Sequence, residues 1–85
     1  MTRKEVIKII SLERDYQEAM EDARGSHIVS TLNMGGILTA IQHNLNKATA
    51  EWYIEQDPYP NTSDLLRKIA ALCVKAGEDY GMTER

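Results

Sequence analysis

The sequence has 85 residues and a formal net charge of −3 at pH 7, with 42% hydrophobic and 27% charged residues. This length allows one domain with a thin core, and the negative charge argues against general nucleic-acid binding, which needs a basic surface. No apolar run approaches the roughly 20 residues of a membrane span, and we expect no signal peptide. With one cysteine, Cys73, there is no internal disulfide. We therefore expect a cytoplasmic protein that gains stability by assembling with copies of itself.

The first predicted helix covers about residues 3–24. Its apolar residues recur at three- and four-residue spacing, which places them on one stripe of a helix. Gly25 follows at the position where glycine commonly ends a helix. The stripe consists of Val6, Ile9, Ile10, Tyr16, Ala19, Met20 and Ala23.

The second predicted helix covers about residues 34–56. Asn33 is a suitable N-cap because its side chain can accept a hydrogen bond from a first-turn N–H group. Residues 27–33 are compatible with either a loop or an additional helical turn. The apolar stripe of this helix consists of Ile37, Leu38, Ile41, Leu45, Ala48, Trp52 and Tyr53.

The third predicted helix covers about residues 63–80. Pro58 and Pro60 indicate a turn over residues 57–63, since proline interrupts a helix, and Thr62 or Ser63 is then the expected N-cap. Gly81 ends the helix, and residues 82–85 are expected to fray. The buried candidates are Leu65, Leu66, Ile69, Leu72, Cys73, Ala76 and Tyr80.

These elements predict an all-α protein, a single domain over residues 1–85. Three amphipathic helices form a bundle that a second subunit can complete, so a homo-oligomer, a dimer or higher, is expected. We interpret Cys73 as a small buried apolar residue. The residues expected to build the shared core are Ile37, Ile41, Leu45, Ile69 and Leu72.

An acidic cluster in the first helix is a weak candidate for a metal site. Glu18 and Asp22 are four residues apart, and Glu18 and Glu21 are three apart, so either pair has the spacing to hold Mg²⁺ through carboxylate oxygens. A solvent-exposed acidic face with Arg14 and Arg24 as local partners explains the same pattern. The residues do not decide between these interpretations.

A second group of residues has the chemistry to bind a phosphorylated ligand. Lys47, Arg67 and Lys68 supply positive charge, and Trp52 and Tyr53 supply rings on which a base can stack. His43, in the second helix, is a further candidate at an interface. The alternative is that the cations form a solvated face and the rings close one end of the bundle.

Three stretches resemble the small MazG-like proteins common in phages and prophages. Residues 13–17 (Glu-Arg-Asp-Tyr-Gln) resemble the family's opening Glu-Arg-x-x-Gln motif, and residues 45–53 (Leu-Asn-Lys-Ala-Thr-Ala-Glu-Trp-Tyr) resemble its central helix. Residues 65–72 (Leu-Leu-Arg-Lys-Ile-Ala-Ala-Leu) resemble its closing helix. The resemblance implies an all-α, usually oligomeric fold. Catalytic relatives are nucleoside triphosphate pyrophosphohydrolases that hold Mg²⁺ with a set of carboxylates.

The sequence departs from the catalytic pattern of that family. The expected acids fall near His43, Asn44 and Lys47, none of which is an anionic Mg²⁺ ligand. The resemblance therefore implies a non-catalytic module without a cofactor, which binds a nucleotide, a phosphorylated small ligand or a host protein, with an accessory or counter-defence role. One alternative is a Mg²⁺-dependent pyrophosphohydrolase that uses Glu18, Glu21 and Asp22; the other is a purely structural helical oligomer.

Overall fold

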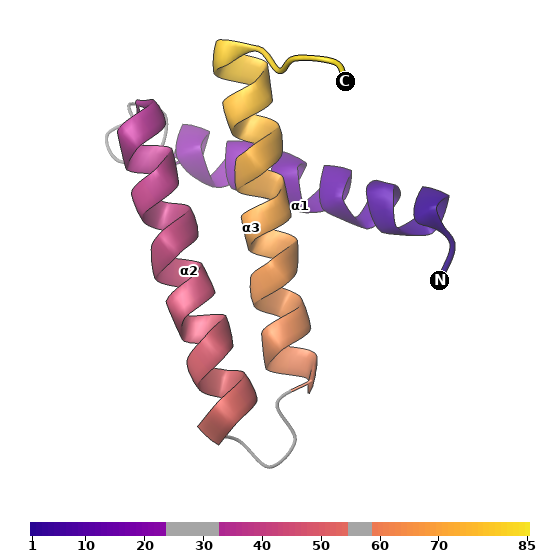
Figure 1. Cartoon of the computed structure of the whole chain (residues 1–85). Helices are drawn as coiled ribbons and strands as arrows, with labels where there is room; N and C mark the ends of the chain where they lie inside the picture. The colour runs from indigo at the N-terminus through magenta and orange to yellow at the C-terminus, as the bar shows by residue number, and fades with distance from the viewer. Residues whose placement is uncertain (24–32, 55–58) are drawn as a thin grey trace.

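The structure is a computed structural model that describes residues 1–23, 33–54 and 59–85. The described residues form three helices, α1 (Arg3–Ala23), α2 (Met34–Ile54) and α3 (Tyr59–Tyr80), and contain no strand. This confirms the predicted all-α class. Residues 24, 55 and 56, which the predicted helices included, and residues 27–32, whose structure was left open, lie outside the described residues. Figure 1 shows α2 and α3 side by side and antiparallel, with α1 crossing α3 at a steep angle.

Helix α1 begins with a reciprocal pair of hydrogen bonds between Thr2 and Glu5. The Glu5 N–H donates to Thr2 Oγ1 and the Thr2 N–H donates to Glu5 Oε1, each at 3.1 Å. This capping box satisfies two backbone donors that a helix start otherwise leaves without an acceptor. Two hydrogen bonds with Thr2 lower the pKa of Glu5, because both favour the carboxylate form. The bond with the Thr2 backbone has the larger effect, and the bond with the Thr2 side chain has the smaller one.

Helix α2 begins at the predicted cap. Asn33 Oδ1 accepts a hydrogen bond of 2.8 Å from the Gly36 N–H, and the Asn33 carbonyl accepts one of 2.9 Å from the Ile37 N–H. A Cβ atom at Gly35 would lie 3.3 Å from Asn33 Oδ1, a tight contact. Glycine in the first turn therefore leaves room for the capping side chain.

Helix α3 begins four residues earlier than predicted, at Tyr59 instead of Ser63. The predicted turn is therefore wrong over residues 59–63, as is the predicted N-cap at Thr62 or Ser63, while residues 57 and 58 lie outside the described residues. Pro60 lies in the first turn, where a backbone N–H has no acceptor within the helix, so proline removes no hydrogen bond there. The predicted end is confirmed: Gly81 has φ of 83° and its N–H donates to the Gly77 carbonyl at 2.9 Å, as in a left-handed helix end.

Helix α3 is the central element of the fold. It contacts both α1 and α2, whereas no described Cα atom of α1 lies within 8 Å of one of α2. Cys73 is exposed, so the prediction that it is buried is wrong. Seven residues earlier on the same face of α3, Leu66 is 52% exposed. The buried apolar residues of the described chain are Ile37, Ala48, Leu65, Ala71 and Leu72.

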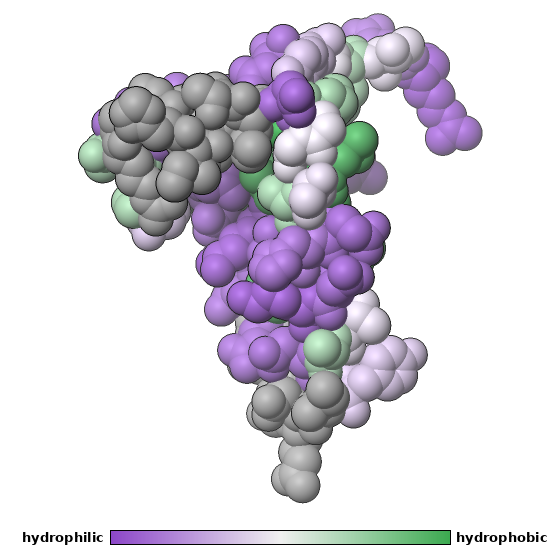
Figure 2. Space-filling model, turned by 90° about the vertical axis from the view of Figure 1, so that its left-hand side faces the viewer, coloured by the Kyte–Doolittle hydropathy of each residue, from purple (hydrophilic) through white to green (hydrophobic). Residues whose placement is uncertain are grey.

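The other residues predicted to build a core shared between subunits are partly exposed in the single chain, and the shared core stays a prediction. Ile41 and Ile69 are intermediate, and Leu45 is 44% exposed. Viewed from the α2 side, Figure 2 shows hydrophilic residues over the middle of the molecule and a hydrophobic patch above them. Among the described helices, none combines the length and the apolar character needed to cross a membrane.

Candidate functional site

A buried ion-pair network joins α1 to α3. Arg14 Nε donates to Glu78 Oε1 at 2.6 Å, and Arg14 Nη1 lies 3.5 Å from Glu21 Oε1. Lys75 Nζ lies 3.7 Å from the same Glu21 oxygen and 3.1 Å from Asp79 Oδ2. Arg14, Glu21 and Lys75 are 7%, 6% and 3% exposed. Glu21 is thus a buried anion between two buried cations.

The positive and negative charges of this network balance, but two of its buried polar atoms are not hydrogen-bonded. Arg14 Nη1 and Glu21 Oε1 are both buried and have no hydrogen-bond partner among the described residues. Burial acts to lower the pKa of Arg14, yet its hydrogen bond to Glu78 and the neighbouring carboxylates outweigh burial and raise the pKa. Because the charges are already removed from water, loss of one partner would leave another buried charge without compensation.

A second set of polar contacts lies nearer the start of α3. Arg67 Nε donates to Glu13 Oε1 at 2.6 Å, and Arg67 Nη1 donates to Asp64 Oδ1 at 2.8 Å. The hydrogen bond to Glu13 is the main reason that the pKa of Arg67 is raised. Gln17 Nε2 donates to the Lys68 carbonyl at 3.3 Å. Charged and polar groups therefore hold α1 against α3 along much of their contact.

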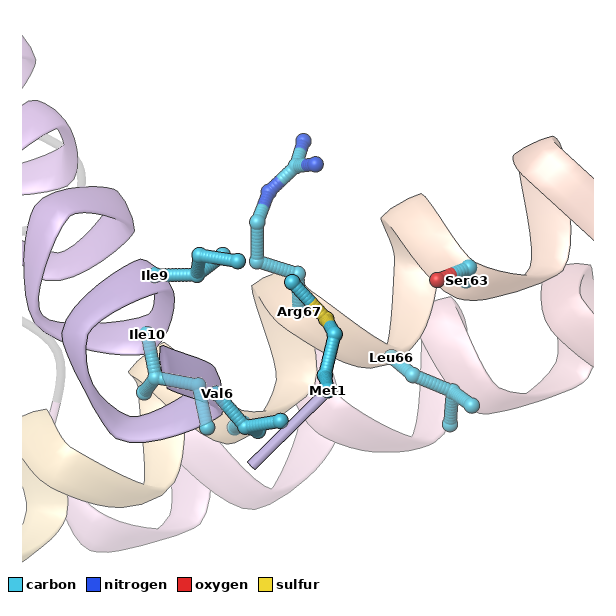
Figure 3. A pocket seen from close by; sticks show the side chains of 8 residues that line it. Met1, Val6, Ile9, Ile10, Ser63, Leu66 and Arg67 are labelled. Atoms are coloured by element: carbon cyan, nitrogen blue, oxygen red, sulfur yellow. The ribbon is translucent and has the colours of Figure 1, made fainter. Parts of the chain in front are cut away.

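An apolar hollow of about 430 Å³ opens between the start of α1 and the first half of α3. In Figure 3, the aliphatic stem of Arg67 lies along this hollow while its guanidinium points away from it. The charged end of Arg67 therefore serves the contacts with Glu13 and Asp64, and the hollow keeps an apolar lining. The lining residues are Met1, Val6, Ile9, Ile10, Ser63, Leu66, Arg67 and Ala70.

Leu66 extends this apolar surface toward α2. It also lines two shallower hollows of about 240 and 310 Å³, both of which include Trp52 and Thr62. Leu66 is 52% exposed and Trp52 is 51% exposed. We call the continuous surface from Val6 across Leu66 to Trp52 the apolar groove, because it touches all three helices.

The structure brings together two of the six predicted ligand-binding residues. Trp52 and Tyr53 line the same hollow, next to Leu45 and Leu66. His43 and Lys47 are exposed on α2 but do not line it. The other two residues lie on α3, where Lys68 is exposed and Arg67 has its charge matched by two carboxylates. The described residues thus place rings, but no cluster of available cations, at this surface.

The predicted metal residues lie in different surroundings. Glu18 and Asp22 are exposed, whereas Glu21 is buried between Arg14 and Lys75. Within the part of the chain that the structure describes, no group of three or more His, Cys, Asp or Glu side chains has the arrangement of a metal site. Recruiting Glu21 to a cation would require breaking its contacts with two buried positive charges.

The sequence analysis predicted neither the apolar groove nor the buried ion-pair network. The network had a visible signal, because Ile10, Arg14, Gln17 and Glu21 follow each other at four- and three-residue spacing on one face of α1. The groove had none, since Val6 and Leu66 come together through the crossing of two helices that are distant in sequence.

The chain was compared with protein-family models, with curated proteins and with solved structures, and none of these comparisons found a match. The resemblance to MazG-like proteins therefore stays a prediction based on the motifs at residues 13–17, 45–53 and 65–72.

Proposed function

We propose that this chain is a non-catalytic helical association module whose working form is a homo-oligomer. The observation that carries the proposal is its surface area. The chain exposes 6524 Å², whereas a folded monomer of 9.6 kDa is expected to expose about 5,100 Å². The difference, about 1,400 Å², exceeds the roughly 800 Å² per partner that a standard protein interface covers.

The dimensions of the chain agree with this surplus of surface. The radius of gyration is 13.7 Å, against about 12 Å for a compact domain of this length. Large apolar side chains contribute to the exposed surface, since Ile7, Leu12, Tyr16 and Trp52 are each more than half exposed. The apolar groove from Val6 across Leu66 to Trp52 is a surface of the kind that marks a site of association.

The role of the assembled module is the binding role that the MazG-like resemblance implies. Support for a nucleotide or phosphorylated ligand is limited to the rings of Trp52 and Tyr53, because the guanidinium of Arg67 is matched by Glu13 and Asp64. Contact with protein surfaces has the broader support of the apolar groove. Pyrophosphohydrolase activity has little, because Glu21 is held between two cations.

Size-exclusion chromatography with light scattering, at several protein concentrations, tests the assembly. We expect a mass of at least two chains, with a blue shift of Trp52 fluorescence as concentration rises, since Trp52 is the single tryptophan and lies on the apolar groove. A well-folded species of 9.6 kDa at every concentration would overturn the proposal. Release of pyrophosphate from nucleoside triphosphates with Mg²⁺, abolished by Glu18→Gln, would overturn its non-catalytic part.

A further inference from the structure

The outer face of α1 carries apolar residues at alternating spacings of three and four. This α1 seam consists of Ile9, Leu12, Tyr16, Ala19 and Ala23. Spacing of this kind over two heptads is the pattern of a helix that packs against another helix along its length. All five side chains are exposed, with Leu12 at 56% and Tyr16 at 61%. The described part of the chain therefore offers the seam no partner helix.

The seam is separate from the face of α1 that packs on α3. The contacts with α3 come from Glu13, Arg14, Gln17 and Glu21, which are intermediate or buried. Helix α2 lies farther away, with no described Cα atom within 8 Å of one in α1. The seam thus remains open after α1 has docked, and Ile9 connects it to the apolar groove.

The charged residues beside the seam change from basic to acidic along α1. Lys8, Asp15 and Asp22 follow each other at seven-residue spacing along one flank. The first turns of α1 also carry the basic Arg3 and Lys4, whereas its second half is mainly acidic. Lys8, Asp15 and Asp22 are exposed, and none joins an ion pair with another described residue. Helix α1 therefore has a basic beginning and an acidic end beside its apolar seam.

We infer that the α1 seam binds the α1 seam of a second copy of this chain in the antiparallel direction, an inference that rests on the proposed function. Antiparallel pairing of one seam along the other places Lys8 near Asp22 of the partner subunit, and the two-fold axis forms this contact twice. Parallel pairing would instead place the acidic half of each helix beside the acidic half of the other. Charge order therefore selects the antiparallel arrangement.

The surplus surface has the size that such a pairing requires. A second copy on the seam would also approach the apolar groove, because Ile9 belongs to both surfaces. Covering both would therefore account for more of the roughly 1,400 Å² by which the chain exceeds a compact monomer than covering the seam alone. A partner helix lying on the seam alone would leave part of this surplus exposed.

The first test replaces Leu12→Glu and compares it with the matched variant Leu38→Glu. The two leucines are 56% and 59% exposed, so neither change removes a buried side chain, and Leu38 lies on α2 away from the seam. We expect Leu12→Glu to weaken self-association by roughly 100-fold or more, and Leu38→Glu to leave it nearly unchanged. Sedimentation equilibrium gives the dissociation constant, and circular dichroism checks that both variants stay helical.

The second test determines the direction of pairing by disulfide formation in a Cys73→Ser background. One sample carries Lys8→Cys, another carries Asp22→Cys, and the two are mixed under mild oxidation. The inference predicts that the mixed disulfide forms fastest. Faster pairing of the Lys8→Cys chain with itself would overturn the antiparallel arrangement.

The charge order has its own variant set. Lys8→Asp turns two attractive contacts into repulsive ones, so we expect association to weaken roughly tenfold, and Lys8→Asp with Asp22→Lys should restore it. Failure of the double variant to restore association would overturn the assigned contact.

If wild type is an oligomer that Leu12→Glu leaves intact, the inference fails while the proposed function stands. If wild type is a folded monomer, both fail.

Discussion

The two contacts of α3 differ in the chemistry that forms them. On the face toward α2, burial is mainly apolar, with Leu65 and Leu72 on one side of α3 and Ile37 and Ala48 in α2. On the face toward α1, the buried side chains include Arg14, Glu21 and Lys75, and Ala71 is the small residue that shares their face. The hairpin of α2 and α3 thus depends on apolar burial, while α1 is attached through charges.

This difference explains why the apolar residues of the α1 seam remain exposed after α1 packs on α3. A helix that needed its apolar stripe for docking on α3 would bury it there, but α1 docks through Glu13, Arg14, Gln17 and Glu21. Its apolar seam, with Leu12 and Tyr16, is left outside. The ionic contacts orient α1, and in this orientation the seam stays exposed, as the proposed pairing requires.

The largest expected effect comes from breaking the apolar contact. Ile37 is completely buried, so Ile37→Ala removes apolar contacts and leaves a cavity, which destabilises the fold by about 3–4 kcal/mol. Urea unfolding followed by circular dichroism measures this loss. Leu38→Ala is the control, because Leu38 is 59% exposed and its truncation should change the free energy of unfolding little. Equal effects of the two variants would contradict the apolar character assigned to this contact.

Breaking the ionic contact should have a slightly smaller effect and a different pattern. Glu21→Gln leaves the buried cations Arg14 and Lys75 without their shared anion, which destabilises the protein by about 3 kcal/mol. Amide hydrogen exchange should rise first in α1, while α2 and α3 keep their protection.

Asp22→Asn is the matched control for that variant, because Asp22 is the neighbouring acid and is exposed. We expect its stability to remain close to that of wild type. Uniform loss of protection in all three helices of Glu21→Gln would show that the ionic contact is not confined to the attachment of α1.

A change at the end of α3 sharpens the comparison without touching either contact. Gly81 has φ of 83° and nothing lies within 4 Å of a Cβ atom built on it. Gly81→Ala therefore introduces backbone strain alone and should destabilise the protein by about 1 kcal/mol. Thermal unfolding measures it, with Gly77→Ala as a control at a helical glycine. A stability equal to wild type would argue against the left-handed end.

The smallest effect concerns the start of α1 and depends on pH. The pKa of Glu5 is lowered in the folded chain, so its contribution to stability is present above its ordinary pKa and is lost as the pH falls through the lowered pKa. Glu5→Gln should therefore lower the urea midpoint at neutral pH and differ less from wild type in acid. A difference between the two proteins that grows in acid would contradict the capping role.

The sequence predicted the helices better than their relation to one another. Periodic apolar residues, the Asn33 cap and Gly81 were sufficient for α1, α2 and the end of α3, because these signals are local. The sequence places the start of α3 four residues late, because proline interrupts the interior of a helix but is accepted in its first turn, where Pro60 lies. Cys73 was predicted to be buried because periodicity shows that a residue is on a stripe, not whether another helix covers that stripe.

The candidate site was less predictable for a physical reason. Trp52 and Tyr53 were identified as rings near a helix end, and they line one hollow. Arg67 was predicted to bind an anionic ligand, but the anions it meets are Glu13 and Asp64 of its own chain. Pairing between distant charges follows from the crossing of α1 over α3, and the spacing of residues along either helix does not contain that information.

The central claim is that the seam which α1 leaves exposed joins two copies of the chain. Sedimentation equilibrium of wild type beside Leu12→Glu, at the same concentrations and with helicity checked for both, tests it most directly. The account predicts an oligomer for wild type and a shift of Leu12→Glu toward the 9.6 kDa monomer. A folded wild-type monomer, or a Leu12→Glu variant that associates as tightly as wild type, would contradict it.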